Sequence, residues 1–151
     1  MILFEQDGAR FNLRVAGVAY RDGKVLLQRF EGEDHWYLPG GRLEMLESAE
    51  EGLLREIREE LGVESRVDRL IWVVENFFPM GGFRYHELGL YFLVDLPTSL
   101  PFGEEFHGHE THLPLFHRWF ALDALPSIKP SFLCTLLPDP PATAGHVIHR
   151  D

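Results

Sequence analysis

The sequence predicts an α/β domain in which strands precede and follow one central helix. Short apolar runs bounded by turn residues predict strands over residues 14–29, 67–78 and 83–96. Apolar residues spaced three and four apart predict a helix over residues 48–61. A length of 151 residues and a hydrophobic content of 45% fit one domain with a packed core. We expect this domain to occupy residues 1–137.

The segment before the helix is predicted to form a β-hairpin over residues 14–29. Residues 15–20 are a continuous run of small and apolar side chains, which is typical of a strand buried on both faces. Asp22-Gly23 is a strong signal for a two-residue hairpin turn, and residues 24–29 supply the returning strand. A further short strand is expected at residues 36–38, just before Pro39-Gly40-Gly41 breaks the chain.

Signals at both ends define the predicted helix. Ser48 is followed three residues later by Glu51, which is the pattern of a capping box. Gly62 stands where a residue in the left-handed conformation commonly ends a helix. On a helical wheel, the apolar side chains fall within an arc of roughly 100°, which we expect to face the core. These residues are Leu53, Leu54, Ile57 and Leu61.

The chain after the helix is predicted to begin with two long strands. Residues 67–78 and 83–96 are rich in aromatic and β-branched side chains, and residues 79–82 join them in a turn. Residues 97–117 are expected to form a long irregular loop. Such loops are uncommon in compact domains and are often functional.

The end of the chain is expected to be less regular. A short strand is predicted at residues 118–120, and short helices are predicted at residues 122–125 and 131–137. The apolar neighbours of Cys134 predict a buried, unreactive thiol. Residues 138–151 contain two adjacent prolines, and we expect them to form a flexible tail.

The net charge limits the classes of partner. Asp and Glu number 24 against 14 Lys and Arg, so the formal net charge is -10. This argues against bulk nucleic acid or an anionic membrane as the partner, because both attract cationic surfaces. Small phosphorylated ligands stay allowed, since bound cations can invert the local field. We expect neither a signal peptide nor a spanning helix, and the single cysteine fits the cytoplasmic location that we expect.

Three carboxylates gather on one side of the predicted helix. Glu56 and Glu60 lie one turn apart, and Glu59 lies beside Glu60 next to the apolar stripe. Arg55 and Arg58 fall on the far side of the wheel and leave this arc un-neutralised. Two interpretations fit the wheel. One is a solvated acidic face, and the other is a site for hard divalent cations such as Mg²⁺ or Mn²⁺, which prefer carboxylate oxygen.

The wider spacing around the helix resembles a known family. From Gly41 to Val63 the chain reads GRLEMLESAEEGLLREIREELGV. This segment matches the Nudix box, G-x5-E-x7-R-E-U-x-E-E-x-G-U with U aliphatic, at every fixed position, and such a match is far more specific than a short glycine motif. The resemblance implies an α/β/α sandwich around a mixed β-sheet. It also implies Mg²⁺- or Mn²⁺-dependent hydrolysis of a nucleoside diphosphate linked to another moiety.

The resemblance implies roles for individual residues of the box. Glu56, Glu59 and Glu60 match the metal ligands of the family. Glu47 matches an acid that helps to hold metal-bound water, so we include it in the metal site. Arg55 matches the arginine that orients these glutamates through hydrogen bonds. The expected catalytic set is therefore Arg55 and the three ligands, together with one group that accepts a proton.

The proton acceptor is less well defined. In the similar family it is a glutamate of the box or one on a loop after the sheet, which here leaves Glu56, Glu104, Glu105 and Glu110. Among the loop residues we favour Glu110. The same loop carries four histidines whose spacing matches no standard zinc pattern, so we expect loop or surface positions for them. They are His107, His109, His112 and His117.

Substrate contacts are expected close to the box and on the strands around it. The candidates are Gly41 at the start of the box, Arg29 before the first polar loop, and Phe78 and Arg84 beside the turn at residues 79–82. Other aromatic side chains are available to stack on a base, although most are expected to pack in the strands. They are Trp36, Tyr37, Phe77, Phe83 and Tyr85.

Three functional hypotheses follow. The first is a hydrolase that cleaves a nucleoside triphosphate, ADP-ribose or a nucleotide sugar by attack of activated water on phosphorus. Pro79 lies roughly where ADP-ribose hydrolases of the similar family carry a proline, although a turn explains it equally. The second is a catalytically silent nucleotide-binding module, against which the complete box argues. The third is an interaction protein with an acidic face. Dimers are common in the similar family, so the resemblance allows a homodimer.

Overall fold

Tight turns build the strand framework. The computed structural model describes residues 1–109 and 114–151. The pairs Asp7-Gly8, Asp22-Gly23 and Gly81-Gly82 each take two successive positive φ values, from 47° to 83°. This is the geometry of a turn whose twist matches that of the flanking strands. The turns join β1 (Leu3–Gln6) to β2 (Ala9–Val18), β3 (Tyr20–Arg21) to β4 (Lys24–Phe30), and β6 (Arg66–Met80) to β7 (Phe83–Asp95).

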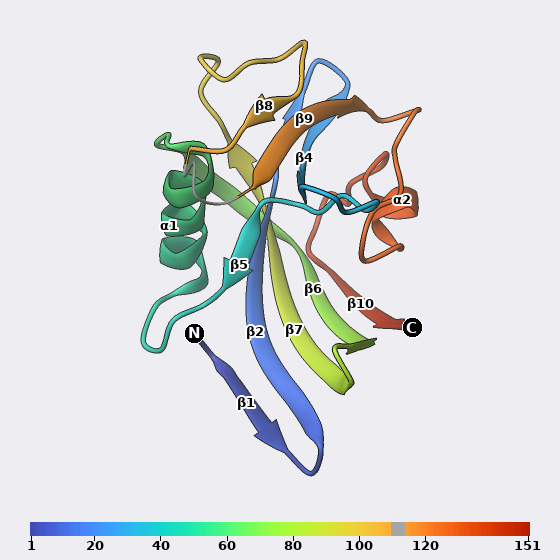
Figure 1. The fold of residues 1–151 in the computed structure, drawn as a ribbon. Helices are drawn as coiled ribbons and strands as arrows, with labels where there is room; N and C mark the ends of the chain where they lie inside the picture. The colour runs from blue at the N-terminus through green and yellow to red at the C-terminus, as the bar shows by residue number, and fades with distance from the viewer. Residues whose placement is uncertain (110–113) are drawn as a thin grey trace.

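Among the described residues, the strands form two sheets (Figure 1). The larger sheet has six strands in the order β1-β2-β7-β6-β10, with β5 (Gly40–Arg42) paired to β2. It is mixed, because β2 runs parallel to β7 and β10 (Gly145–Arg150) runs parallel to β6. The smaller sheet has the order β3-β4-β9-β8, where β8 is Phe106–His107 and β9 is Leu115–Ala121.

The hairpin predicted over residues 14–29 is divided between the two sheets. β2 pairs with β7 up to Val18, whereas only Tyr20 and Arg21 turn back on β4. The chain changes sheets at Ala19, whose carbonyl accepts a hydrogen bond from Leu26 N at 3.1 Å. A run that is apolar throughout gives no alternation from which its partner strand can be inferred. Trp36 and Tyr37 likewise form isolated bridges, with Ile128 and Gln28 respectively, in place of the strand predicted at residues 36–38.

The helix α1 (Ala49–Leu61) agrees with its sequence signals. Glu51 N donates to Ser48 Oγ at 3.1 Å, and Ser48 N donates to Glu51 Oε2 at 2.9 Å, which completes the capping box. Gly62 ends the helix with φ 70°, and its N–H donates to Arg58 O. Local hydrogen bonds therefore fix both ends of α1, and with them the positions of its carboxylates.

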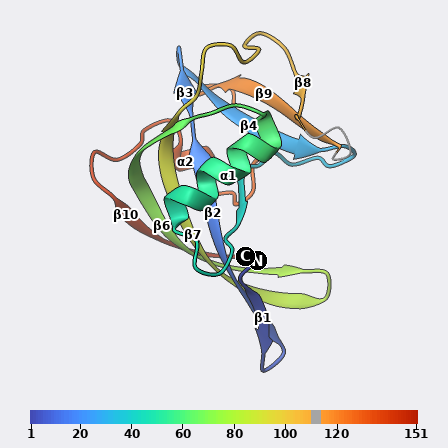
Figure 2. The same ribbon diagram turned by 90° about the vertical axis from the view of Figure 1, so that its left-hand side faces the viewer.

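Two apolar cores lie on opposite faces of the larger sheet. The core beneath α1 combines its apolar stripe with side chains of β2 and β7, namely Val15, Leu53, Ile57, Phe92 and Val94. The other core joins Ala16, Val18 and Tyr91 to the smaller sheet and to Leu133 of α2 (Leu133–Leu136). Figures 1 and 2 show α1 and α2 on opposite sides of the strands. This confirms the expected α/β/α sandwich around a mixed sheet.

The C-terminal segment differs from its prediction as a flexible tail. Residues 145–150 form β10, which pairs with β6 from Trp72 to Phe77. Asp151 N donates to Phe77 O at 2.9 Å, and Arg69 Nη2 donates to Pro141 O at 2.7 Å. The prolines mark the bend that brings the chain back to the sheet, and the β-branched Val147 and Ile148 suit the strand that follows.

Other local predictions near the end of the chain are corrected as well. β9 extends on both sides of the predicted residues 118–120, and residues 122–125 form a turn rather than a helix. Cys134 is exposed, because the single turn of α2 buries Leu133 and Leu137 and leaves the thiol outside. Within the described ranges, no helix combines the length and apolarity needed to cross a membrane.

Candidate active site

The carboxylates of α1 lie against the backbone of β5. Gly40 N donates a hydrogen bond to Glu60 Oε1 at 3.1 Å. At Gly41, a side-chain Cβ would lie only 2.5 Å from Glu56 Cδ, so the lack of a side chain there makes room for this carboxylate. β5 is itself held by pairing with Val15 and Ala16 of β2. The two glycines thus bring a helix face and a sheet edge into direct contact.

Glu60 is the most deeply placed of these acids, with 7% of its surface exposed. Its Oε2 accepts a hydrogen bond from Gln28 Nε2 at 2.6 Å. Burial raises the pKa of Glu60 to about 8, the charge of Glu56 adds to this, and the Gln28 hydrogen bond opposes it. Among the described residues, no cationic side chain contacts the Glu60 carboxylate, so no ion pair offsets the burial of its charge.

Arg55 ties the remaining acids together. Its Nε and Nη2 donate to the two oxygens of Glu47 at 2.7 and 2.9 Å. Its Nη1 donates to Glu56 at 3.0 Å and reaches Glu59 at 3.4 Å. The Arg55 hydrogen bonds lower the pKa of Glu47 to about 2, whereas burial raises the pKa of Glu56. One guanidinium thus links two helix acids to an acid of the preceding loop.

This arrangement corrects the wheel-based expectation that neither arginine neutralises the acidic arc. Arg55 does so because its long side chain bends along the helix toward Glu56 and Glu59. Arg58 instead pairs with Glu64 at 3.1 Å in a solvent-exposed contact beyond the helix end. The orienting role that the resemblance implied for Arg55 is consistent with these contacts.

Three residues near the carboxylates were not singled out from the sequence. They are Arg14, Gln28 and Gly40. His117, which was expected in a loop or on the surface, contacts Gln28. Arg14 lies close enough for its charge to oppose the pKa increases of Glu56, Glu60 and Tyr37. Within the described part of the chain, no carboxylate forms an ion pair with Arg14, which leaves a cation available beside the acids. Its sequence signal is a charge just before the apolar run at residues 15–20, and the structure places it within β2.

The histidine-rich loop docks on the end of α1. His109 N donates to Glu60 O at 2.8 Å, and the His109 ring occupies the space above Gly62. His107 and His109 are exposed, as expected, but His117 lies on β9 with none of its surface exposed. Its position was missed because β9 begins three residues before the predicted strand. Glu110 and His112 lie outside the described residues.

The predicted substrate contacts divide into two groups. Arg29 follows Gln28 on β4 and pairs with Glu105 at 3.2 Å, while Glu104 is exposed. Gly41 lies at the carboxylates. Arg84, by contrast, lies far along β7 from the carboxylates. It is six residues, or about 20 Å, before Leu90, which pairs with Val15 next to Gly41.

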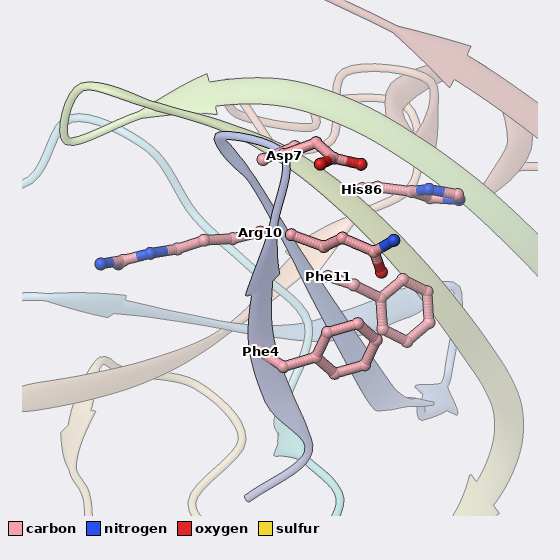
Figure 3. A pocket seen from close by; sticks show the side chains of 7 residues that line it. Phe4, Asp7, Arg10, Phe11 and His86 are labelled. Atoms are coloured by element: carbon pink, nitrogen blue, oxygen red, sulfur yellow. The ribbon is translucent and has the colours of Figure 1, made fainter.

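Phe78 stacks on Tyr85 with ring centroids 5.2 Å apart, in the same distal part of the β6–β7 hairpin as Arg84. The structure therefore does not bring Phe78 or Arg84 to the carboxylates. A separate open pocket of about 310 Å³ lies in that half of the sheet, between β1, β2 and β7 (Figure 3). Phe4 and Phe11 face it with their rings 5.2 Å apart, and His86 borders it.

The donor atoms at the end of α1 suit a hard divalent cation. Glu56, Glu59 and Glu60 offer only carboxylate oxygens, which Mg²⁺ and Mn²⁺ prefer. The buried Glu60 carboxylate and the space for Glu56 above Gly41 fit such an ion. Among residues 1–109 and 114–151, no three acidic, histidine or cysteine side chains are already gathered as a metal cluster. In this arrangement Glu56 and Glu59 contact Arg55 instead.

The fold and the carboxylate helix together define a Nudix-type α/β/α domain. A family model described as NUDIX domain matches residues 10–135. The chain therefore belongs to the Nudix family, as the box between Gly41 and Val63 had indicated.

Similar proteins agree with this assignment. A MutT-like protein of Streptomyces ambofaciens is 44% identical over 66 residues, which are 43% of this chain and 43% of that protein. A Bacillus subtilis (strain 168) protein, YjhB, provisionally named an ADP-ribose pyrophosphatase, is 31% identical over 119 residues, 77% of this chain and 53% of that protein. This chain thus spans about half the length of these curated relatives.

A solved structure is similar over most of both chains. The crystal structure of a MutT NUDIX hydrolase from Burkholderia pseudomallei has a TM-score of 0.61 and 27% sequence identity. The similarity covers 82% of this chain and 95% of that one. The two-sheet architecture and the position of the carboxylate helix are therefore those of a Nudix domain.

Proposed function

We propose that this Nudix domain is a metal-dependent pyrophosphohydrolase that cleaves the diphosphate linkage of a nucleoside diphosphate joined to another moiety. The observation that carries the proposal is the junction of α1 and β5, where the buried Glu60 lies beside Glu56 and Arg55 links Glu56 to Glu47. A solvated acidic face would need neither the burial of Glu60 nor the room that Gly41 leaves. The enzyme names of the relatives support the same class.

The residues of the site have distinct functions in this proposal, and Glu56 is a candidate for two of them. Glu56, Glu59 and Glu60 would hold Mg²⁺ or Mn²⁺, and Arg55 keeps Glu47 and Glu56 in place. When bound, the ion neutralises diphosphate oxygens and acidifies a water molecule. Arg14 supplies a positive charge for a phosphate on the sheet side of the acids.

Among the described residues, Glu56 is suited to accept the proton of the attacking water. Its carboxylate lies against the backbone of β5, and the hydrogen bond from Arg55 fixes its direction. Glu110 stays the alternative from the sequence. It directly follows His109, whose backbone is bonded to Glu60, but it lies outside the described residues. Glu105 pairs with Arg29 and is less free to act.

ADP-ribose is the first substrate to test. The Bacillus subtilis relative, which aligns with 77% of this chain, is provisionally named an ADP-ribose pyrophosphatase. Nucleoside triphosphates and nucleotide sugars are the rivals within the same reaction class. Pro79 gives little guidance, since it lies exposed next to the Gly81-Gly82 turn and fits the turn explanation. Small-molecule substrates without a nucleic-acid or membrane partner, a cytoplasmic location and a homodimer remain expectations from the sequence.

A substrate panel tests the proposal. The protein is incubated with ADP-ribose, UDP-glucose, diadenosine polyphosphate and the common nucleoside triphosphates, with Mg²⁺, with Mn²⁺ and with EDTA. We expect release of a nucleoside monophosphate from at least one substrate only when metal is present. Metal-dependent binding of a nucleotide without turnover across the panel would favour the silent binding module instead. Turnover that EDTA leaves unchanged would contradict the metal-dependent mechanism.

The two adjacent glycines of β5 offer a matched pair of variants. At Gly40, φ is 153° and a Cβ would lie 2.9 Å from Ala16 Cα, so Gly40→Ala should lower the free energy of unfolding by about 2 kcal/mol. At Gly41, the three atoms nearest to an added Cβ all belong to the Glu56 carboxylate. Gly41→Ala should therefore keep Tm near that of the wild type and reduce kcat by about tenfold or more. Full activity of Gly41→Ala would show that Glu56 need not lie there.

A further inference from the structure

A row of buried, hydrogen-bonded polar side chains leads from β9 through β4 to Glu60 of α1. His117 and Gln28 are partners in the register of β4 and β9. His117 Nε2 and Gln28 Oε1 lie 2.9 Å apart, and Gln28 Nε2 lies 2.6 Å from Glu60 Oε2. The exposed fractions of His117, Gln28 and Glu60 are 0%, 3% and 7%. Three polar side chains from two strands and one helix thus form a single, largely buried path.

With a divalent cation bound, the partners fix the direction of both hydrogen bonds along this path. The metal-bound Glu60 carboxylate is ionised and only accepts hydrogen bonds, so Gln28 must then turn its amide N–H toward Glu60. Its carbonyl oxygen then points at His117 and needs a donor, which the Nε2–H of a neutral imidazole supplies. Burial lowers the pKa of His117 to about 4, so the ring is neutral near pH 7. If the His117 donor were absent, the Gln28 amide could rotate and place an oxygen against the carboxylate.

A buried histidine at position 117 has an energetic cost that packing does not explain. With its Nε2 engaged, His117 has a buried Nδ1 without a hydrogen-bond partner among the described residues. A phenylalanine, although somewhat larger, would also place an aromatic ring beside Phe106, whose ring centroid lies 5.4 Å from that of His117. Leaving a buried polar atom unsatisfied is unfavourable by about 1–3 kcal/mol. The histidine is therefore better explained by the bond it donates than by stability.

We propose that His117 is a positioning residue that locks the amide of Gln28, so that Gln28 presents its N–H group to Glu60 and holds that carboxylate in the orientation that receives a divalent cation. This inference rests on the proposed function, because it assumes that Glu60 is a metal ligand. The inference goes beyond the proposed function, because it gives two side chains outside the Nudix box an influence on metal affinity. Partners of this kind typically change metal affinity by about 10–100-fold when removed.

Mn²⁺ titration of the substrate-free protein tests the proposal without relying on activity. The variants are His117→Phe, which keeps the ring but removes the donor, His117→Gln, which keeps an N–H donor of similar reach, and Gln28→Leu. His107→Phe is the matched control, because this exposed histidine lies on the neighbouring strand β8 and contacts Phe116 rather than Gln28. Thermal unfolding is recorded for every variant, so that a folding defect is separated from a loss of affinity.

We expect His117→Phe and Gln28→Leu each to weaken Mn²⁺ binding about tenfold or more. His117→Gln should stay within about threefold of the wild type, and His107→Phe should not change the affinity. The double variant Gln28→Leu/His117→Phe should bind as Gln28→Leu does, since both changes break one path. Should His117→Phe fail to fold, the comparison of Gln28→Leu with the wild type and His117→Gln still decides.

Two outcomes would overturn the inference. One is wild-type affinity in Gln28→Leu or His117→Phe, and the other is additive losses in the double variant, which would indicate a general packing effect. If the wild type itself binds no Mn²⁺, the metal-dependent function fails first and this inference fails with it. If the wild type binds Mn²⁺ and hydrolyses its substrate while all variants bind equally, only the positioning role of His117 and Gln28 is lost.

Discussion

Glu60→Gln should leave a folded protein that has lost turnover, with kcat reduced by roughly 10²-fold or more. Glutamine has nearly the same shape, but its neutral amide cannot provide the charge that a divalent cation requires. Loss of a residue that merely supports a metal ligand typically weakens binding or activity by about 10–100-fold, so the loss of a ligand sets a higher expectation. Glu64→Gln is the control, since Glu64 is exposed and lies outside the site. Steady-state kinetics at saturating Mg²⁺ gives the measurement.

Glu60→Gln should also change how the stability of the metal-free protein depends on pH. The pKa of Glu60 is raised from 4.5 to about 8 in the fold, so the folded state keeps a proton that the unfolded state has already lost. The contribution to stability is complete below pH 4.5 and disappears as pH rises through 8. His117 acts in the opposite direction, because its pKa is lowered to about 4, but this effect is complete by about pH 6.5.

Stability should therefore fall between pH 6.5 and 8.5 in the metal-free wild type, by about 2 kcal/mol from Glu60 alone. Burial raises the pKa of Glu56 too, so Glu56 acts in the same direction, and it remains in Glu60→Gln. The variant should thus show a flatter profile rather than a flat one. Urea unfolding at several pH values in EDTA measures the difference. Equal slopes for the two proteins would mean that Glu60 is ionised in the fold without penalty.

The sequence predicted best what is determined by neighbouring residues. The ends of α1 follow from Ser48, Glu51 and Gly62, which act within one turn of the helix. The β6–β7 hairpin follows from its composition and turn. By contrast, β10 pairs with β6 more than 70 residues away, so the segment containing Val147 carries no local signal of its partner. The β1–β2 hairpin had a usable signal in Asp7-Gly8, the same type of pair as Asp22-Gly23.

The residues of the candidate site likewise differ in whether they could be predicted from local sequence signals. Glu47, Arg55 and Glu56 belong to one motif of fixed spacing, and the structure places them in contact. Gln28 and His117 meet only because β4 and β9 pair in one particular register. A shift of one residue in this pairing would place the two side chains on opposite faces of the sheet. Their role could therefore not be predicted before the strand pairing was known.

Arg55→Lys should nearly inactivate the enzyme although it keeps the positive charge. Arg55 donates two hydrogen bonds to Glu47 and a third to Glu56, in directions that a planar guanidinium spans and a single ammonium cannot. We expect kcat/KM to fall by roughly 10²-fold and the Mg²⁺ concentration for half-maximal rate to rise by about tenfold. Arg58→Lys is the control on the same helix, because Arg58 only pairs with the exposed Glu64.

The pH dependence of stability separates this orienting role from a simple loss of charge. Arg55 holds the pKa of Glu47 at about 2, below its ordinary 4.5, so this pair stabilises the fold above pH 4.5 and the benefit is lost as pH falls toward 2. Arg55→Lys should therefore lower Tm at pH 7 and differ less from the wild type near pH 2.5. A variant that keeps the wild-type Tm at pH 7 but loses activity would show that Arg55 acts on the substrate rather than on Glu47. Full activity would mean that one point charge is enough to hold both acids, and the fork of hydrogen bonds would then have no part in catalysis.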